Sequence, residues 1–327
     1  MDFNELMVSS PHNLHIVDAL GKCQMQIRNH QKILASISGG SDSDVMLDLI
    51  VRCGGKEKTT FVFFNTGLEY EATKRQIEYL NKKYDIEIQV IPPIKPIPTC
   101  IREFGVPFWS KHVSEMIMRL QRHNFEWEDE SYDELIQKYP KCQSALKWWC
   151  NQYILGDGNK SRFNINYVPY LKEFLILNPP TFKISNRCCH YAKKQPAKKY
   201  LSSQNFDLNC VGVRQAEGGV RSTRYKNCYT QKDDGINQYR PLFWFSDEDK
   251  RVYDDHYNIK HSDCYSVWGM KRTGCAGCPF SMEWEQELEL ARKHEPKFHK
   301  AMLKVFSESY EYRRQFEEFR KKMRSQE

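Results

Sequence analysis

Two groups of residues in this 327-residue chain have the types and the spacing to do chemistry. The first is the segment Ser38–Ser43, with the sequence Ser-Gly-Gly-Ser-Asp-Ser. Its glycines allow backbone N–H groups to approach an anion closely, and its serines add hydroxyl donors. The second group contains two adjacent cysteines, Cys188 and Cys189, and a Cys-x-x-Cys pair, Cys275 and Cys278. Adjacent cysteines do not bridge each other without strain, whereas their thiolates suit a soft metal or a cluster. We therefore expect an anion site and a thiolate site.

The elements around the serine- and glycine-rich segment are predicted to aim it at a ligand. An apolar run of strand length, 32–37, precedes it, and a run rich in helix-forming apolar residues, 45–51, follows it. A strand, a glycine turn and a helix start together direct backbone N–H groups and a helix N-terminus at a phosphate. Asp42 or Asp44 can cap that helix. The segment is not a Walker loop, because the lysine and the four-residue spacer are missing.

A second loop is expected at the same edge of the sheet. The apolar run 59–64 predicts a strand buried on both faces, and it ends at Asn65-Thr66-Gly67-Leu68-Glu69. A polar helix over 71–83 and a third strand over 86–91 follow. Strands that alternate with helices predict an α/β fold with a doubly wound, mainly parallel sheet, whose ligands bind at the carboxyl ends of the strands. We therefore expect both loops to face one crevice.

A third loop carries arginines. The apolar residues around 210–213 predict a strand, which ends in a glycine-rich turn containing Arg214, Glu217 and Arg221. Arginine binds phosphate or sulfate through two parallel hydrogen bonds. The alternative is a charged loop exposed to solvent. A last strand is expected at 239–242.

These loops resemble the PP-loop ATP pyrophosphatase superfamily, and within it the phosphoadenosine phosphosulfate (PAPS) reductase family. Ser38–Ser43 resembles its SGGxDS loop, Asn65–Glu69 its second-strand segment, and Arg214, Glu217 and Arg221 its G-h-R-x-x-E-x-x-x-R element. The resemblance implies binding of ATP or an adenylyl sulfate by Ser38, Gly39, Gly40, Ser41, Asp42, Ser43, Asn65, Thr66, Gly67, Glu69, Arg214, Glu217 and Arg221. Of these, it implies catalytic roles for Asp42, Arg214 and Arg221, and it allows Mg²⁺ as a companion of the nucleotide.

The cysteines resemble the cluster motif of adenylyl-sulfate reductases. Between Cys189 and Cys275 lie 85 residues, and Lys193 and Pro196 match the Cys-Cys-x-x-x-Lys-x-x-Pro context of that motif. The resemblance implies a 4Fe–4S cluster held by Cys188, Cys189, Cys275 and Cys278. Structural zinc is an alternative, because four cysteines serve zinc equally well. A redox-active pair of Cys275 and Cys278 is another.

The reaction expected from this resemblance depends on whether the chain has a nucleophilic cysteine near its C-terminus. Reductases of adenylyl sulfates use a nucleophilic cysteine in a C-terminal segment, and no cysteine follows Cys278. We therefore expect ATP-dependent activation and sulfur transfer to an acceptor such as a nucleic acid, with a protein as sulfur or electron donor. Reduction of an adenylyl sulfate to sulfite, with Cys228 or Cys264 as the thiol, is the alternative. A nucleotide-sensing protein with structural zinc and no turnover is the alternative of another class.

Composition sets the wider limits. The net charge of +7 favours anionic ligands without proving nucleic-acid binding. No apolar run reaches the length of a membrane span, and the start of the chain lacks the pattern of a secretory signal, so a cytoplasmic location is expected and no membrane partner. Twelve cysteines in such a chain favour thiols and metal ligands over disulfides.

The expected division is an N-terminal helix over 1–30, an α/β domain over 31–245 with a helical insertion at about 105–178, and a cysteine loop with a helical tail over 246–327. In the insertion, Trp127, Trp148 and Trp149 lie among lysines. They are interpreted either as core residues or as a surface on which bases stack.

Overall fold

The computed structural model describes residues 3–156, 158–159, 161–218, 225–233 and 235–326. The chain divides into two compact units, each built from two stretches of sequence. Unit 1 contains residues 1–94 and 192–276, and unit 2 contains residues 95–191 and 277–327. The division falls inside the second cysteine pair, between Ala276 and Gly277.

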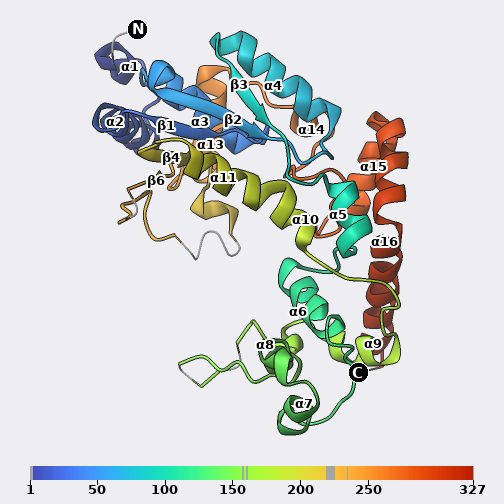
Figure 1. Cartoon of the computed structure of the whole chain (residues 1–327). Coiled ribbons are helices and arrows are strands. Elements are labelled where there is room, and N and C mark those ends of the chain that lie inside the picture. The colour runs from blue at the N-terminus through green and yellow to red at the C-terminus, as the bar shows by residue number, and fades with distance from the viewer. Residues whose placement is uncertain (1–2, 157, 160, 219–224, 234, 327) are drawn as a thin grey trace. The chain divides into compact units, whose positions relative to one another are not determined.

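Unit 1 is built around a mostly parallel sheet (Figure 1). Its strands are β1 (Ile33–Ser36), β2 (Thr59–Phe64), β3 (Ile88–Ile91), β4 (Leu208–Val211), β5 (Tyr229–Thr230) and β6 (Asn237–Tyr239), in the order β3-β2-β1-β4-β6-β5. Only the short β5 is antiparallel to its neighbour β6. β1 pairs with both β2 and β4. The strands β2 and β3 lie on one side of β1, and β4, β6 and β5 lie on the other, so the strand order reverses at β1. A ligand crevice is expected at such a switch point, and the loops after β1 and β4 meet there.

Helices cover both faces of this sheet. The helices of unit 1 are α1 (Phe3–Val8), α2 (Leu14–Asn29), α3 (Ser41–Arg52), α4 (Glu71–Tyr84), α11 (Gln195–Ser203), α13 (Asp247–Tyr257) and α14 (Asp263–Ser266). Alternate strand residues face opposite sides: Ile33 and Ala35 join the core that contains α2 and α3, whereas Leu34 packs with Val62 and Phe206 on the other side. The predicted doubly wound α/β fold is confirmed.

Unit 2 is helical and has its own core. Its helices are α5 (Ile97–Phe104), α6 (Lys111–Gln121), α7 (Tyr132–Lys138), α8 (Gln143–Trp149), α9 (Leu171–Leu177), α10 (Arg187–Cys189), α15 (Trp284–His294) and α16 (Pro296–Arg324). Trp148 and Trp149 are fully buried in the core, and Trp127 packs against that core. Of the two interpretations of these tryptophans, the structure supports core packing.

Most expected elements form close to their expected bounds. The third strand begins two residues later than expected, at Ile88, because Asp85 takes a left-handed conformation that ends α4. The last parallel strand ends at Tyr239 rather than at residue 242. Within the described residues, no helix is both long enough and apolar enough to cross a bilayer.

Candidate nucleotide-binding site

The loop between β1 and α3 is closed by its own serine hydroxyls. The Ser43 hydroxyl donates to the Gly40 carbonyl at 2.7 Å, and it accepts from the Ser38 backbone N–H at 3.2 Å. The Gly40 N–H in turn points at the Ser38 hydroxyl, 3.3 Å away. Gly40 is the N-cap of α3 and has no side chain to cap the helix, and its carbonyl accepts from the Ser43 N–H at 2.9 Å. The N-terminus of α3 therefore lies at the loop, where its dipole favours an anion.

Gly39 is required by both conformation and space. Its φ is +67°, a region that residues with a Cβ rarely adopt. A Cβ at this position would lie 2.7 Å from Cγ2 of Thr73, on α4. The glycine therefore lets the loop pass directly over α4.

The arginine after β4 reaches the aspartate of the loop. Arg214 Nε donates to Asp42 Oδ1 at 2.9 Å, and its Nη1 donates to Asp247 Oδ1 at 2.8 Å. Arg214 and Asp42 are nearly buried, whereas the Asp247 side chain is 88% exposed. Burial opposes the charge of Arg214, but the two carboxylates outweigh it and raise the pKa of the guanidinium. Asp42 and Arg214 were expected at one site, and the structure brings them together.

The second predicted loop is rigid and partly buried. The Thr66 hydroxyl and backbone N–H both donate to Glu69 Oε1, at 2.6 and 3.1 Å, and the Gly67 N–H donates to Asn65 Oδ1 at 2.8 Å. Burial raises the pKa of Glu69, and the nearby charge of Lys193 and the Thr66 hydrogen bonds lower it in part. The loop thus carries a desolvated carboxyl held in a fixed position.

Tyr265 was not predicted, and it lies at the mouth of the first loop. Its hydroxyl accepts from the Thr273 N–H at 3.1 Å and lies 2.8 Å from the Thr273 hydroxyl. A Cβ on Gly40 would approach the same hydroxyl within 3.3 Å. Burial raises the pKa of Tyr265, whereas donors from Thr273 and from the Ser41 backbone lower it in part. No sequence signal marks this tyrosine, because it follows the loop by more than 200 residues.

A cavity of about 530 Å³ opens beside Tyr265 and His261. Its size falls within the ~300–1,000 Å³ range of small-molecule sites. Its other lining residues, Ile259, Lys260, Asp263 and Ser266, come from the segment around α14.

An ion-pair network fixes the first turn of α3 behind the loop. Asp44 is fully buried, and its Oδ2 lies 3.0 Å from His261 Nδ1 and accepts from Gln76 at 3.0 Å. His261 Nε2 lies 3.0 Å from Asp254 Oδ2, which also pairs with Lys250. Burial opposes the charge of His261, but hydrogen bonds with Asp254 and Asp44 raise its pKa. Burial raises the pKa of Asp44, which His261 counteracts.

All twelve cysteines are free of disulfides. Cys188, Cys189 and Cys278 belong to unit 2 and Cys275 to unit 1. Across the described residues, no three His, Cys, Asp or Glu side chains are gathered as a metal-binding group. Cys264, expected as an accessible thiol, is fully buried. Cys100, which the sequence did not single out, is close enough to Cys189 to feel its charge, although burial is the main reason that its pKa is raised to about 11.

The backbone around Cys278 is shaped by one glycine and one tyrosine. Gly277 has a φ of +63°, and a Cβ there would lie 2.7 Å from both Met302 Sδ and the Tyr310 hydroxyl, on α16. Tyr310 donates to the Gly277 carbonyl. Gly277, one of the two residues between the thiols of the Cys-x-x-Cys pair, is therefore fixed against α16.

Within unit 1, residues next to both halves of the cysteine motif border the second loop. The Ala276 N–H, directly after Cys275, donates to the Leu68 carbonyl at 3.0 Å. The charge of Lys193, the lysine of the Cys-Cys-x-x-x-Lys context, acts on Glu69. A donor set of four thiols suits an iron–sulfur cluster chemically.

The remaining predicted residues are placed less fully. Glu217 lies in the short helix Gln215–Glu217 after Arg214 and is partly exposed. Arg221 lies outside the described residues.

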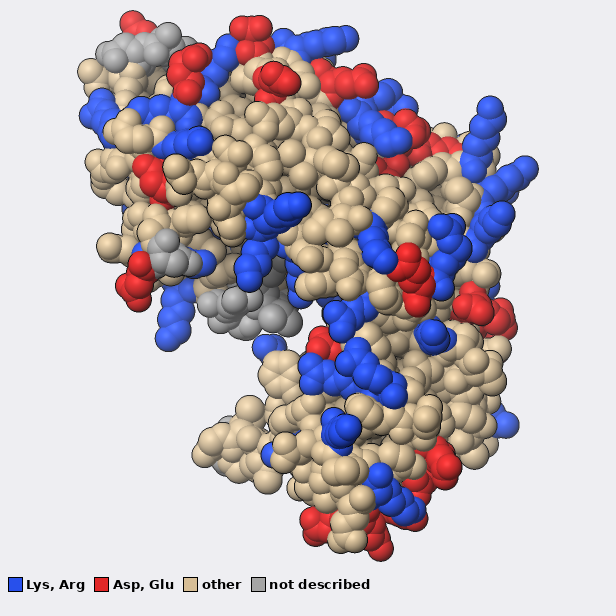
Figure 2. Space-filling model, viewed as in Figure 1, with Lys and Arg blue, Asp and Glu red and all other residues tan. Residues whose placement is uncertain are grey.

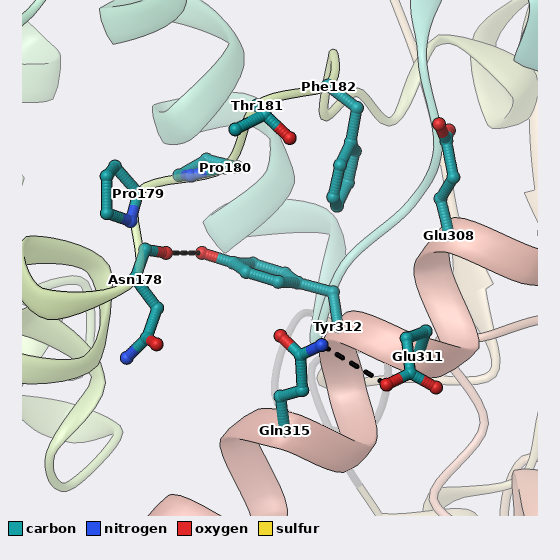
Figure 3. Close-up of a pocket in the computed structure, with 9 residues that line it drawn as sticks. All are labelled: Asn178, Pro179, Pro180, Thr181, Phe182, Glu308, Glu311, Tyr312 and Gln315. Atoms are coloured by element: carbon teal, nitrogen blue, oxygen red, sulfur yellow. Dashed lines mark hydrogen bonds between the residues drawn. The ribbon is translucent and has the colours of Figure 1, made fainter.

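A separate hollow of about 400 Å³ lies in unit 2 (Figure 3). Tyr312 crosses it and donates to the Asn178 carbonyl at 2.6 Å, and Gln315 donates to Glu311. The charged groups of its lining, Glu308 and Glu311, are acidic and do not suit a nucleotide phosphate.

Comparison with known proteins found a family model and a relative that match this chain. Residues 32–147 match the family model described as the phosphoadenosine phosphosulfate reductase domain. An uncharacterised protein of Methanocaldococcus jannaschii is 24% identical over 266 residues, which cover 80% of this chain and 38% of that protein. The chain thus spans well under half the length of that relative.

Solved structures with similar backbones include three proteins. PAPS reductase from Candida auris is 13% identical, with 81% of this chain and 96% of that chain covered and a TM-score of 0.39. An NH3-dependent NAD synthetase from Campylobacter jejuni is 11% identical, with 95% and 96% covered and a TM-score of 0.36. The U34-tRNA thiolase of Methanococcus maripaludis, solved with its [4Fe-4S] cluster, is 12% identical, with 88% and 78% covered and a TM-score of 0.35.

Proposed function

We propose that this chain, whose residues 32–147 match the phosphoadenosine phosphosulfate reductase domain, is an enzyme that binds an adenine nucleotide at the loop after β1. It uses ATP to activate an acceptor for sulfur transfer. The observation that carries this proposal is the closed Ser38–Ser43 loop, joined to Arg214 through Asp42. The glycine-rich loop, the N-terminus of α3 and the guanidinium held by Asp42 support an anion site at the switch point of the sheet.

In this proposal the loop stabilises the departing pyrophosphate. The N-terminus of α3 and the hydroxyls of Ser38 and Ser41 are proposed to face the phosphate oxygens, in a loop that Ser43 already holds closed. The Ser38 hydroxyl, which donates to the Ser43 hydroxyl at 3.2 Å, would turn to the ligand. Arg214 adds a charged donor that Asp42 orients. Gly39 and Gly40 leave room for the phosphates, and Arg221 is proposed to add a second positive charge. Mg²⁺ is proposed to accompany ATP.

The second loop is proposed to bind the adenosine. Asn65, Thr66, Gly67 and Glu69 follow β2, whose end adjoins the end of β1 in the parallel register. Glu69 keeps Thr66 in place through two hydrogen bonds, so the loop offers a preformed edge rather than a mobile one. Glu217 is proposed to support Arg214 from the following turn.

Cys188, Cys189, Cys275 and Cys278 are proposed to hold a 4Fe–4S cluster. Such a cluster supplies an iron that can carry a sulfur atom or an electron. The proposal is supported by the motif, by the fixed backbone at Gly277, and by the approach of Lys193 and Ala276 to the second loop. The acceptor is proposed to be a nucleic acid, and the donor of sulfur or electrons a protein. Structural zinc is the alternative occupant.

A second reaction, the reduction of an adenylyl sulfate to sulfite, is favoured by the identity of the matched domain. It requires a thiol that accepts the sulfonate. Cys264 is unsuited because it is fully buried, which leaves the partly exposed Cys228 as the thiol expected from the sequence.

The two reactions give different products. The anaerobically purified full chain is incubated with ATP and a mixed nucleic-acid pool, or with APS or PAPS and a thiol reductant. Release of pyrophosphate from ATP, with AMP bonded to the acceptor, supports activation, whereas sulfite from APS or PAPS supports reduction. Nucleotide binding with no product from any of them would support the sensing alternative. Failure to bind any adenine nucleotide would overturn the proposal as a whole.

A further inference from the structure

A small basic pocket lies on unit 2, outside the nucleotide site. It has a volume of about 240 Å³, and its cations are Arg119, Arg122, Lys141 and Arg187. Glu115 is the acidic residue of the lining. The pocket is smaller than the ~300 Å³ lower limit for drug-sized ligands, so it fits a phosphate group rather than a whole nucleotide.

Most of the positive charge in this pocket is uncompensated. Arg119 pairs with Glu115 at 2.6 Å and donates to the Ser144 hydroxyl at 2.6 Å, so it is fixed in the wall. Among the described residues, Arg122, Lys141 and Arg187 form no ion pair. Cations that converge on one hollow repel each other, and an anion relieves that repulsion.

The pocket walls are held by contacts independent of these cations. Asn186 donates to the Lys111 carbonyl at 2.9 Å and to Glu115 at 3.3 Å, which ties the segment carrying Arg187 to α6. Gln121 donates to the Phe182 carbonyl at 2.7 Å and accepts from the Ile184 N–H. The exposed cations Arg122 and Lys141 can therefore be changed without removing the contacts that build the pocket.

The pocket continues a polar face of α6. His112, Glu115, Arg119 and Arg122 are three, four and three residues apart, the spacing of a single helix face. At the far end of that face, the half-exposed Phe163 ring packs against His112 with centroids 5.3 Å apart. The Arg162 guanidinium lies 5.5 Å from the same ring. Figure 2 shows Lys and Arg side chains gathered over α6.

We propose that this face of α6 binds a single-stranded nucleic acid, with a backbone phosphate in the Arg122–Lys141–Arg187 pocket and a base against Phe163. The 11 residues of α6 span about 16 Å, enough for a few nucleotides. Phosphate contacts beside an exposed aromatic ring are the pattern of sequence-tolerant single-strand binding. The inference extends the proposed function by giving the nucleic-acid acceptor a binding surface on unit 2.

The test is fluorescence anisotropy with the full-length chain, in the absence of ATP. The probe is a fluorescein-labelled, mixed-sequence single strand of roughly 20 nucleotides, made as DNA and as RNA and titrated at several salt concentrations. The double variant Arg122→Glu/Lys141→Glu is expected to raise Kd by at least about tenfold and to reduce the salt slope by about one, because the one backbone phosphate in the pocket is no longer neutralised. The matched control is Lys300→Glu/Lys304→Glu, which reverses two exposed lysines on α16 and is expected to change neither quantity beyond the effect of net charge.

A second variant separates stacking from charge. Phe163→Ala is expected to weaken binding about tenfold at an unchanged salt slope, because stacking releases no counterions. Trp244→Ala, an exposed aromatic of unit 1, is its control. Inorganic phosphate added at constant ionic strength is expected to displace the strand from the wild type.

Three outcomes would overturn the inference. The first is that neither the DNA nor the RNA strand binds at low salt. The second is that Arg122→Glu/Lys141→Glu and Lys300→Glu/Lys304→Glu lose the same affinity for the strand. The third is that the chain binds inorganic phosphate but no strand. None of them bears on product formation from ATP, so failure here and failure of the proposed reaction remain distinguishable.

Discussion

Among single residues, Arg214 offers the sharpest test of the nucleotide site. Arg214→Lys keeps the charge but removes the fork that contacts Asp42 and Asp247 together. We expect nucleotide affinity to fall about tenfold, equal to about 1.4 kcal/mol, when measured by calorimetry with ATP. Arg251→Lys is the matched control, because Arg251 also pairs with two carboxylates but is exposed. Equal affinities for the wild type and Arg214→Lys would contradict a role at the phosphates.

His261 gives a prediction about pH. Its pKa is raised above the ordinary 6.5, so the native state binds more protons than the unfolded state. The stability that His261 contributes is therefore fully present below about pH 6.5 and is lost as the pH rises through the raised value. The pKa of Asp44 is also raised, so its contribution to the free energy of unfolding likewise falls as the pH rises.

We expect His261→Gln to lower the free energy of unfolding most at acidic pH, with the difference from the wild type shrinking as the pH rises. Urea unfolding at a series of pH values measures this difference. His256→Gln, an exposed histidine on α13, is the control. A constant difference between the wild type and His261→Gln across pH would mean that packing, rather than charge, accounts for the effect of His261.

At the scale of elements, the contact between the first loop and α4 can be tested by a pair of changes. Gly39→Ala places a methyl group 2.7 Å from Thr73 Cγ2 and also forces a residue with a Cβ to a φ of +67°. We expect it to cost about 1–2 kcal/mol in backbone strain plus a steric penalty of similar size. Gly269→Ala shows the strain alone, because Gly269 has a φ of +72° and open space around its Cβ position.

Thr73→Ser removes the clashing methyl group and keeps the hydroxyl, so Gly39→Ala/Thr73→Ser should recover the steric part of the loss. Urea unfolding and ATP binding are measured for the wild type, Gly39→Ala, Thr73→Ser and the double variant. The four values give the coupling energy between positions 39 and 73. If the double variant were no better than the sum of the two single variants, the close contact would not be the cause.

The elements were largely predictable because local pattern decides them. The apolar runs 32–37 and 59–64 are typical of strands buried on both faces of a sheet. The glycine pair at 39–40 marks the turn between strand and helix. Contacts between distant segments were not predictable in the same way. Asp42 and Arg214 were assigned to one nucleotide site through the family resemblance, but the contact between them was not predicted. Tyr265, His261 and Asp247 had no local signal at all.

For the whole molecule, the central prediction concerns iron. We expect Cys→Ala changes at Cys188, Cys189, Cys275 and Cys278 each to remove most of the iron and the visible absorbance of the anaerobically purified chain, because a cluster needs its full set of thiolates. Cys142→Ala is the matched control, since Cys142 is buried in unit 2 and its thiol donates to the Arg119 carbonyl.

The remaining cysteines are expected to be dispensable for iron, and Cys100 is the critical case because of its closeness to Cys189. A requirement for Cys100 in place of one of the four would overturn the ligand assignment. Zinc in a colourless protein would favour the structural alternative.

The division into two units was not readable from the sequence. Each unit is assembled from two separated stretches of the chain. The boundary at 276–277 falls inside the Cys-x-x-Cys motif, residues 275–278, which the sequence placed in a single segment. Composition changes little there, so no linker signal marks it. The core position of Trp148 and Trp149 was likewise undecided by the sequence, because aromatics among lysines serve a core and a surface equally well.

The exposed carboxylate of Asp247 has a consequence for the energetics of binding. Asp247 accepts a hydrogen bond from Arg214 Nη1, so a carboxylate already stands where the proposed site would place a phosphate oxygen. A free arginine side chain gives up as much as ~2 kcal/mol of rotamer entropy when it is immobilised. Arg214 loses that freedom during folding, because Asp42 and Asp247 hold it. If the proposed site is correct, nucleotide binding there exchanges one oxyanion for another and does not have to order a mobile side chain.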